Sequence, residues 1–255
     1  MRGLLEDGRY MSMCTNPPSD HAVVFEGPPG FTYEPGQHGI FRVSRGEDEL
    51  DDAPGTVFFA STTTRSWTLA VHPSASRGNV VITVKRGTNA SRRLHETMRP
   101  QAGSIRFVGV AGTFTPALSR SRPVLLIAGG IGVTPFRAML PAFIAQQRPV
   151  ALVYSVRVVA KSAFITELTT PRPGCTVTVT ATGEPPNSAW TGRRGRVDAA
   201  LLNECAPGGG GARSCDVFIC GPPSFEEACR TALAGLGLSA ANIFSESFDS
   251  NLTDA

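Results

Sequence analysis

The stretch LLIAGGIGVTPF, residues 125–136, constrains the fold of this chain more than any other. Its apolar run ends in the glycines Gly129, Gly130 and Gly132, and Thr134 is the expected N-cap of a following helix. Glycines between a strand and a helix let an anionic group approach the free N–H groups of the helix N-terminus. The spacing is also compatible with a tight turn that binds no ligand and needs glycine only for its backbone conformation.

The second half of the chain alternates between apolar strands and helical patterns. The predicted strands cover 124–128, 150–156, 175–182, 216–221 and 242–248, and helical patterns fill the segments between them. This alternation is typical of a parallel sheet with helices on both faces. Pro141 lies within the first helical pattern and argues against an unbroken helix there. We predict an α/β domain over residues 121–255.

The first half, residues 1–120, contains short alternating runs separated by Gly, Pro and Asp. The predicted strands cover 21–27, 39–43, 56–62, 66–71, 80–86 and 104–110. Such spacing with little helix predicts a small antiparallel β-barrel domain. One short helix is expected over 94–99.

Composition argues against several classes of function. A net charge of +3 over 255 residues, without a dense basic run, argues against nucleic-acid binding. No apolar run approaches the roughly 18 residues of a membrane span, and the N-terminus does not resemble a signal peptide. The six cysteines form no C-x-x-C pair, so we expect no zinc or iron–sulfur site. These features predict a cytoplasmic protein without a bound metal.

Three further motifs have chemistry that suits a nucleotide. RSWT, residues 65–68, combines an arginine that can bind phosphate with a tryptophan that can stack on a flat ring. GTNAS, residues 87–91, precedes the short predicted helix and offers Ser91 as its cap. CGPP, residues 220–223, turns sharply after a buried strand and directs Cys220 toward the sheet edge of the glycine turn. The alternatives are a core tryptophan, ordinary helix capping and a packed thiol.

Seven motifs, in collinear order, resemble the ferredoxin–NADP reductase superfamily of flavoprotein reductases, as found in oxygenase reductases and flavohaemoglobins. They are FTYEPGQHGIFRV, RSWT, GTNAS, GGIGVTP, YSVR, GRRGRVD and CGPP. The resemblance implies a flavin-binding β-barrel followed by a nicotinamide nucleotide-binding α/β domain. It also implies FAD and NADPH or NADH as cofactors.

The resemblance assigns site residues by position in each motif. For the flavin it implies Arg65 on a phosphate, Trp67 and Thr68 along the isoalloxazine, and the remaining contacts from Ser66, Val84, Lys85, Gly87, Asn89, Ala90, Ser91 and the stacking residue Phe248. For the nicotinamide nucleotide it implies Gly129, Gly130, Gly132, Thr134, Ser155, Arg157, Cys220, Gly221 and Pro222. Thr68, Cys220 and Glu246 are the implied catalytic residues.

The expected function is hydride transfer from NAD(P)H to bound FAD, followed by electron transfer to a separate redox protein or small-molecule acceptor. Two alternatives stay open: a flavin-fold enzyme acting on a small organic substrate in a biosynthetic pathway, and a non-catalytic nucleotide-binding module. The predicted helix near 91–99 favours FAD, although FMN is possible. The second α/β strand ends without an acid, so Ser155 and Arg157 favour NADPH, while similar residues occur in relatives that prefer NADH.

Overall fold

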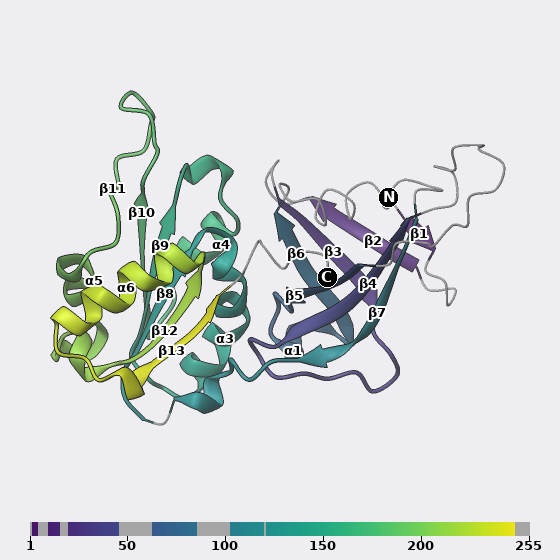
Figure 1. Ribbon diagram of the computed structural model, residues 1–255, viewed down its shortest axis with the longest axis horizontal. Coiled ribbons are helices and arrows are strands. Elements are labelled where there is room, and N and C mark those ends of the chain that lie inside the picture. Colours follow the sequence, from purple (N-terminus) through teal and green to yellow (C-terminus); the bar gives the residue numbers. More distant parts are fainter. Residues whose placement is uncertain are drawn as a thin grey trace, which may run out of the picture.

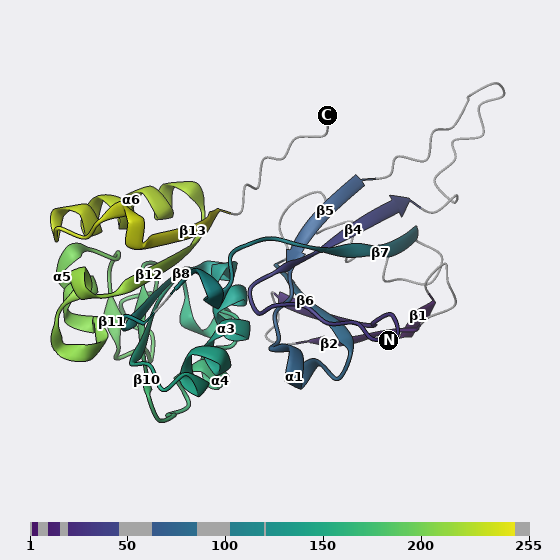
Figure 2. The ribbon, with the colours of Figure 1, turned by 90° about the horizontal axis from the view of Figure 1, so that it is seen from below.

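The computed structural model of this chain describes residues 2–4, 10–15, 20–45, 63–85, 103–119 and 121–247. A β-rich N-terminal part and an α/β C-terminal part lie side by side (Figures 1 and 2). The predicted class, an antiparallel β-barrel domain followed by an α/β domain with a parallel sheet, is confirmed. The proposed boundary at residue 120 falls between β7 (Gly103–Ala111) and β8 (Val124–Gly129).

The N-terminal part is built from two antiparallel sheets. One has the order β1-β2-β3-β6 and the other β5-β4-β7, and the Leu69–Ile82 bridge joins them. The elements are β1 (Arg2–Leu4), β2 (Tyr10–Thr15), β3 (Asp20–Glu26), β4 (His38–Arg45), β5 (Thr63–Thr68), α1 (Pro73–Ser76) and β6 (Asn79–Lys85). Alternate residues of β6, such as Val84, face a core shared with Phe41. The strand predicted at 56–62 and the helix at 94–99 lie outside the described residues.

The C-terminal part is a six-stranded parallel sheet with the order β11-β10-β9-β8-β12-β13. Its further strands are β9 (Val150–Val156), β10 (Cys175–Ala181), β11 (Arg193–Arg194), β12 (Asp216–Gly221) and β13 (Ile243–Ser247). The chain builds outward from β8 to β11 and then crosses to β12 on the other side of β8. Ligands of such sheets bind at the carboxyl ends of the strands where this reversal occurs.

Helices cover both faces of the parallel sheet, which gives three layers (Figure 1). On one face lie α3 (Thr134–Ala145) and α4 (Ile165–Thr169), and on the other α5 (Ala199–Cys205) and α6 (Pro223–Gly235). The 3-10 turns are η2 (Pro116–Leu118), η3 (Gly130–Val133), η4 (Val159–Lys161), η5 (Pro207–Gly209), η6 (Ala212–Ser214) and η7 (Ala240–Asn242). Within the described ranges, no helix is both long and apolar enough to cross a membrane.

The expectation of a break at Pro141 is wrong, because α3 continues through it. A proline within a helix costs about 3 kcal/mol. Pro141 is exposed, whereas Phe136, Leu140 and Phe143 on the same helix are fully buried. Burial of each large apolar side chain contributes about 1.5–3 kcal/mol, which offsets the cost of the proline.

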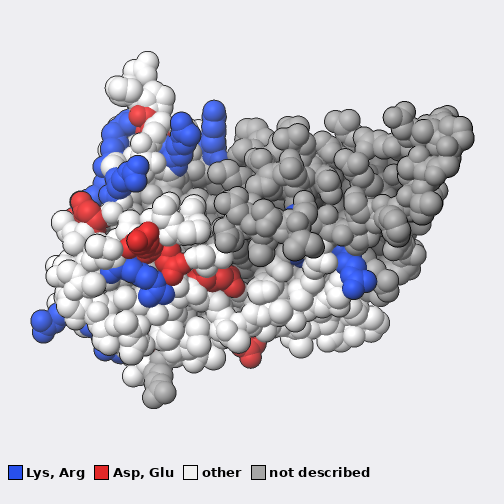
Figure 3. Space-filling model, viewed as in Figure 1, with Lys and Arg blue, Asp and Glu red and all other residues white. Residues whose placement is uncertain are grey.

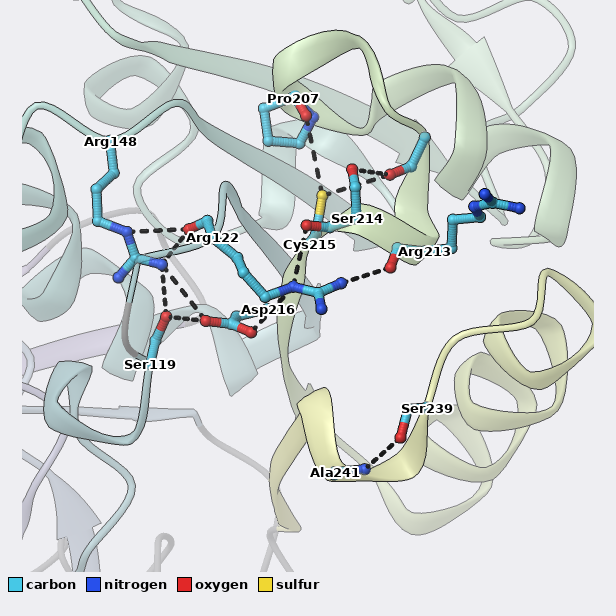
Figure 4. Close-up of polar contacts among 11 residues, drawn as sticks. Ser119, Arg122, Arg148, Pro207, Arg213, Ser214, Cys215, Asp216, Ser239 and Ala241 are labelled. Carbon is cyan, nitrogen blue, oxygen red and sulfur yellow. Dashed lines mark hydrogen bonds and ion pairs between the residues drawn. The ribbon is translucent and has the colours of Figure 1, made fainter.

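A buried polar network fastens the connection between the two domains to the amino end of the sheet (Figure 4). Ser119 Oγ donates to Asp216 Oδ2 at 2.6 Å, and Arg148 Nη2 donates to Ser119 Oγ at 2.6 Å. Arg148 Nη2 and Arg122 Nε each lie 3.5 Å from a carboxylate oxygen of Asp216. Because Ser119 and Arg122 belong to the connection, the network ties it to Arg148, two residues before β9, and to Asp216, the first residue of β12.

Asp216→Asn removes the charge that compensates the buried Arg148 guanidinium. We expect the free energy of unfolding to fall by about 3 kcal/mol, because breaking a buried pair leaves an uncompensated charge. Urea denaturation of the variant and the parent chain measures this difference.

Glu204→Gln is the matched control, since Glu204 pairs with Arg193 at the surface at 2.9 Å. Its effect should stay below about 1 kcal/mol. Equal effects of the two variants would contradict a structural role for the buried network.

Candidate functional site

The glycine turn after β8 is a 3-10 turn, η3 (Gly130–Val133), that continues directly into α3. The expected role of Thr134 as N-cap is therefore wrong: its backbone is helical, and its Oγ1 donates to Ile131 O at 3.0 Å. The first N–H groups of a helical segment have no partner within it. In the continuous helical segment formed by η3 and α3, the first of these N–H groups belongs to Gly130, four residues before Thr134.

The three glycines of the turn are needed for different physical reasons. A Cβ on Gly132 would lie 2.3 Å from Cys220 O, and one on Gly129 would lie 2.8 Å from the Phe225 ring. Gly130 has φ +57°, and a Cβ there would have no atom within 4 Å. Gly129 and Gly132 therefore permit close packing, whereas Gly130 faces open space. Gly132 stays a predicted contact of the nicotinamide nucleotide, and Gly130 is the glycine of this turn with open space in front of it.

The CGPP turn at the end of β12 lies directly against the glycine turn. A Cβ on Gly221 would lie 3.2 Å from Gly129 Cα and 2.7 Å from the Phe225 ring. Pro222 is exposed and precedes α6 in extended conformation. The two motifs predicted to share a sheet edge thus touch through their backbones.

Cys220 is fully buried at the end of β12, in register with Glu246 of β13. Burial raises the pKa of its thiol well above the usual range, and the carboxylates of Glu246 and Glu226 act in the same direction. A raised pKa favours the protonated thiol at neutral pH, and the catalytic role implied for Cys220 stays a prediction. Its placement suits a neutral group packed beside a ligand.

The two domains meet at a polar cluster formed by Thr68, His38 and Glu246. His38, the first residue of β4, is in register with Thr68 of β5. His38 Nδ1 lies 3.6 Å from Glu246 Oε1, which belongs to the other domain. His38, which the sequence analysis missed, therefore lies next to Thr68 in the sheet and approaches Glu246 across the interface, so it links two of the predicted catalytic residues.

The Pro-Gly-Gln turn that precedes His38 was the sequence signal that could have identified it. Gln37 Oε1 accepts from Glu34 N at 2.8 Å, and Gln37 Nε2 donates to Gly112 O at 3.1 Å. Gly36 has φ +94°, and a Cβ there would lie 2.2 Å from Phe114 O. These contacts fix the start of β4 and with it the position of His38.

A second missed residue, Glu226 of α6, fixes the strand that carries Glu246. Ser245 Oγ and Ser247 Oγ each donate to one oxygen of the Glu226 carboxylate, and Arg230 Nε donates to it at 2.8 Å. Desolvation acts to raise the pKa of Glu226, but these hydrogen bonds and the Arg230 charge leave it below its usual value. Because Ser245 and Ser247 alternate with Glu246, holding them against α6 directs Glu246 to the opposite face of β13.

Three buried polar atoms lack a hydrogen-bond partner in the part of the chain that the structure describes. They are Thr68 Oγ1, Thr83 Oγ1 and Glu246 Oε2. Burying a hydroxyl without a partner costs about 1–3 kcal/mol. Atoms of this kind at a domain interface fit a ligand with a polar edge, as the isoalloxazine of a flavin has.

The structure describes some of the other residues predicted to bind the flavin, and the rest lie outside its described part. Trp67 is half-buried, with its ring centroid 5.4 Å from that of Phe41, so part of it packs against the barrel core. Arg65 is half-buried and Ser66 exposed, whereas the side chain of Val84 lies in the core. Any flavin contact of Val84 would therefore come from its backbone. The side chain of Lys85 and the residues Gly87, Asn89, Ala90, Ser91 and Phe248 lie outside the described part.

Basic side chains gather over the ends of β9, β10 and β11, the strands furthest from β13 in the sheet order (Figure 3). Ser155 is buried and in register with Gly129, and Arg157 is exposed just beyond β9. Arg193 pairs with Glu204, while Arg194 donates to the carbonyl groups of neighbouring loop residues. No ion pair of Arg157 with another described residue is present, which leaves its guanidinium available to an anionic ligand.

Alanine substitutions at Gly130 and Gly132 should separate nucleotide binding from folding. Gly132→Ala should lower the thermal midpoint of unfolding, because its Cβ collides with backbone at Cys220. Gly130→Ala places its Cβ in open space at a strain of about 1–2 kcal/mol, so its main effect should be a higher KM for the nicotinamide nucleotide.

Thermal unfolding and steady-state kinetics of both variants check this expectation. A Gly130→Ala variant with an unchanged KM would contradict the assignment of Gly130 to the nucleotide approach.

Comparison with known proteins agrees with this geometry. Residues 126–231 match the model of the oxidoreductase NAD-binding domain family. The chain is 30% identical to the stachydrine N-demethylase reductase subunit of Rhizobium meliloti, over 95% of this chain and 67% of that protein. It is 31% identical to ferredoxin–NADP reductase B of Sorangium cellulosum, over 72% of this chain and 78% of that protein. Several other curated relatives are longer, and the chain spans between 38% and 52% of their length.

Among solved structures, the fold is similar to the FAD/NAD-binding domain of nitric oxide dioxygenase from Vibrio cholerae. The TM-score is 0.71 at 24% identity, covering 93% of this chain and 95% of that one. Fold, motif order and sequence identity lead to one assignment. The chain belongs to the ferredoxin–NADP reductase superfamily, and it is an FAD- and NAD(P)-dependent flavoprotein oxidoreductase.

Proposed function

We propose that this chain is the reductase component of a two-protein system: it takes electrons from NAD(P)H through FAD and delivers them to a separate oxygenase. The observation that supports this most is the meeting of Thr68 and His38 of the barrel with Glu246 of the α/β domain. The names of relatives support the acceptor class, because they include the reductase subunit of an N-demethylase and the electron-transfer component of a dioxygenase.

In this proposal the α/β domain binds and orients the nicotinamide nucleotide. The N–H groups from Gly130 onward face the pyrophosphate at the start of η3 and α3. Ser155 and Arg157 bind the ribose end of the adenosine. The neutral, buried Cys220 packs near the nicotinamide and excludes water there.

The barrel side provides hydrogen-bonding and charged side chains for the flavin. Bound FAD supplies the hydride-accepting ring and the ability to release electrons one at a time. The hydroxyl of Thr68 binds that ring, and Glu246 lies across the interface from His38, with Oε1 3.6 Å from Nδ1. Arg65 neutralises a flavin phosphate.

The proposal is tested by identifying the cofactor and by its response to the nucleotide. The purified protein should release FAD on denaturation, and anaerobic NADPH or NADH should bleach the absorbance of the bound flavin. With a purified partner oxygenase, electron delivery should depend on this chain. Flavin that neither nucleotide bleaches would overturn the proposed function.

Arg157→Ala tests the choice between the two nucleotides. We propose that Arg157 pairs with the 2′-phosphate of NADPH, because it is exposed at the end of β9 and no acid follows that strand. Losing a charge-assisted hydrogen bond costs about 1.5–3 kcal/mol, so kcat/KM for NADPH should fall at least about tenfold and that for NADH little.

Steady-state kinetics with both nucleotides measure the ratio. Arg213→Ala is the control, since Arg213 is exposed in η6, next to the start of β12 and away from the nucleotide edge. A parent protein that prefers NADH, or an unchanged ratio in Arg157→Ala, would show that Arg157 does not read the phosphate.

A further inference from the structure

Arg137 is the fourth residue of α3, and neither the sequence motifs nor the proposed function gives it a role. Its Nη1 donates to Ala70 O of the barrel domain at 2.7 Å. Its Nε donates to both carboxylate oxygens of Glu167 of α4, at 2.8 Å and 3.0 Å. One guanidinium group therefore joins two helices of the α/β domain to a backbone carbonyl of the barrel.

Residues of its own domain restrict the Arg137 guanidinium on two sides. Its Cζ lies 4.4 Å from the centroid of the Phe164 ring, which is buried. Phe164 precedes α4 and has φ +59°, a left-handed conformation that is uncommon outside glycine. Because the guanidinium is planar and carries its donors in a fixed fork, one position satisfies the ring, Glu167 and Ala70 together. Arg137 is thus a rigid link rather than a loose surface contact.

The barrel residue that accepts this hydrogen bond is itself firmly held. Ala70 is fully buried and lies two residues after Thr68, which is proposed to bind the flavin ring. Within this segment Leu69 N donates to Gln37 O and Ala70 N donates to Val81 O, each at 2.9 Å. The position of Ala70 O is therefore fixed relative to the end of β5, and so is the position of Arg137.

The helix that carries Arg137 also begins at the proposed nucleotide site. Helix α3 faces the barrel and continues the glycine turn η3 (Figures 1 and 2). A Cβ on Gly36, in the turn before β4, would lie 2.2 Å from Met139 Cε of the same helix. Helix α3 therefore contacts the barrel next to both β4 and β5. The Met139 contact is apolar and non-directional, whereas the Arg137 hydrogen bond depends on distance and angle.

We propose that Arg137 is a positioning residue for hydride transfer, which holds the nucleotide site of α3 in register with the flavin site of β4 and β5. The proposal rests on the proposed function stated above and adds the residue that couples its two binding sites. In the transfer, a hydride with its electron pair leaves C4 of the nicotinamide for N5 of the flavin. Reacting atoms must approach to about 3–3.5 Å for such a step. Arg137 acts on this distance through Ala70 and α3.

The proposal predicts that Arg137→Met slows hydride transfer without weakening the binding of either cofactor. Methionine keeps an apolar stem beside Phe164 and removes the donors to Ala70 and Glu167. The rate constant of flavin reduction at saturating nucleotide should fall about ten- to hundredfold, because a misplacement of about 1 Å can cost this much. The Kd values for FAD and for the nucleotide should each change less than about twofold, since each site lies within one domain. Stopped-flow reduction under anaerobic conditions and equilibrium titrations measure these quantities.

Three further variants separate positioning from folding. Arg137→Lys keeps the charge but lacks the fork that reaches Ala70 and Glu167 together, so its loss of rate should be smaller. Glu167→Gln weakens the anchor at a half-exposed carboxylate and should slow reduction about two- to fivefold. Arg172→Met is the matched control, because Arg172 donates to Glu167 O within its own domain, and it should reduce flavin at the parent rate.

A parent-like reduction rate in Arg137→Met would overturn the proposal. An equal loss in Arg172→Met would also overturn it, as would weaker FAD binding at an unchanged reduction rate, because both indicate a role in folding alone. If Arg137→Met does not fold, parent rates in both Arg137→Lys and Glu167→Gln overturn the proposal. A parent protein whose bound flavin neither nucleotide reduces would instead refute the proposed function itself.

Discussion

The nucleotide edge of this protein depends on a backbone-to-backbone contact between the turns that follow β8 and β12. Side chains at Gly129, Gly132 and Gly221 would collide with Phe225 or with the opposite turn. This contact lies at the ends of the adjacent strands β8 and β12, where the sheet reverses its order. It leaves Gly130, with positive φ and open surroundings, as the point at which a ligand can approach the backbone.

The proposed function also requires that the two domains keep a fixed relative position. The proposed flavin contacts come from the barrel, whereas the nucleotide contacts come from the α/β domain. The buried Ser119–Arg148–Asp216 network holds the connection at the amino end of the sheet. At the other end, Glu226 holds β13 so that Glu246 meets His38 across the interface. Both sets of contacts are polar networks. Such a network restrains the geometry only when its donors and acceptors have hydrogen-bond partners.

The motifs correctly predicted the fold class and the superfamily, because strand and helix periodicity and the order of the motifs are local properties of the chain. The N-cap role of Thr134 and the break at Pro141 were predicted wrongly. In both places packing prevailed over local preference: the glycines allow an early 3-10 turn, and the buried face of α3 offsets the proline. His38 and Glu226 were missed: the Pro-Gly-Gln turn marks the start of the strand that carries His38, but no spacing in the sequence relates either residue to Thr68 or Glu246.

The sequence by itself determined that this chain has a β-barrel half and an α/β half, and that glycine turns lie at the ends of buried strands. Only the tertiary structure decided which glycine is open and which are packed, because that depends on Cys220 and Phe225, about 90 residues further along the chain. Only the tertiary structure, likewise, placed Arg137 of α3 against Ala70 of the barrel. Packing between distant segments sets that contact, and the pattern along one helix cannot reveal it, because periodicity reports only local secondary structure.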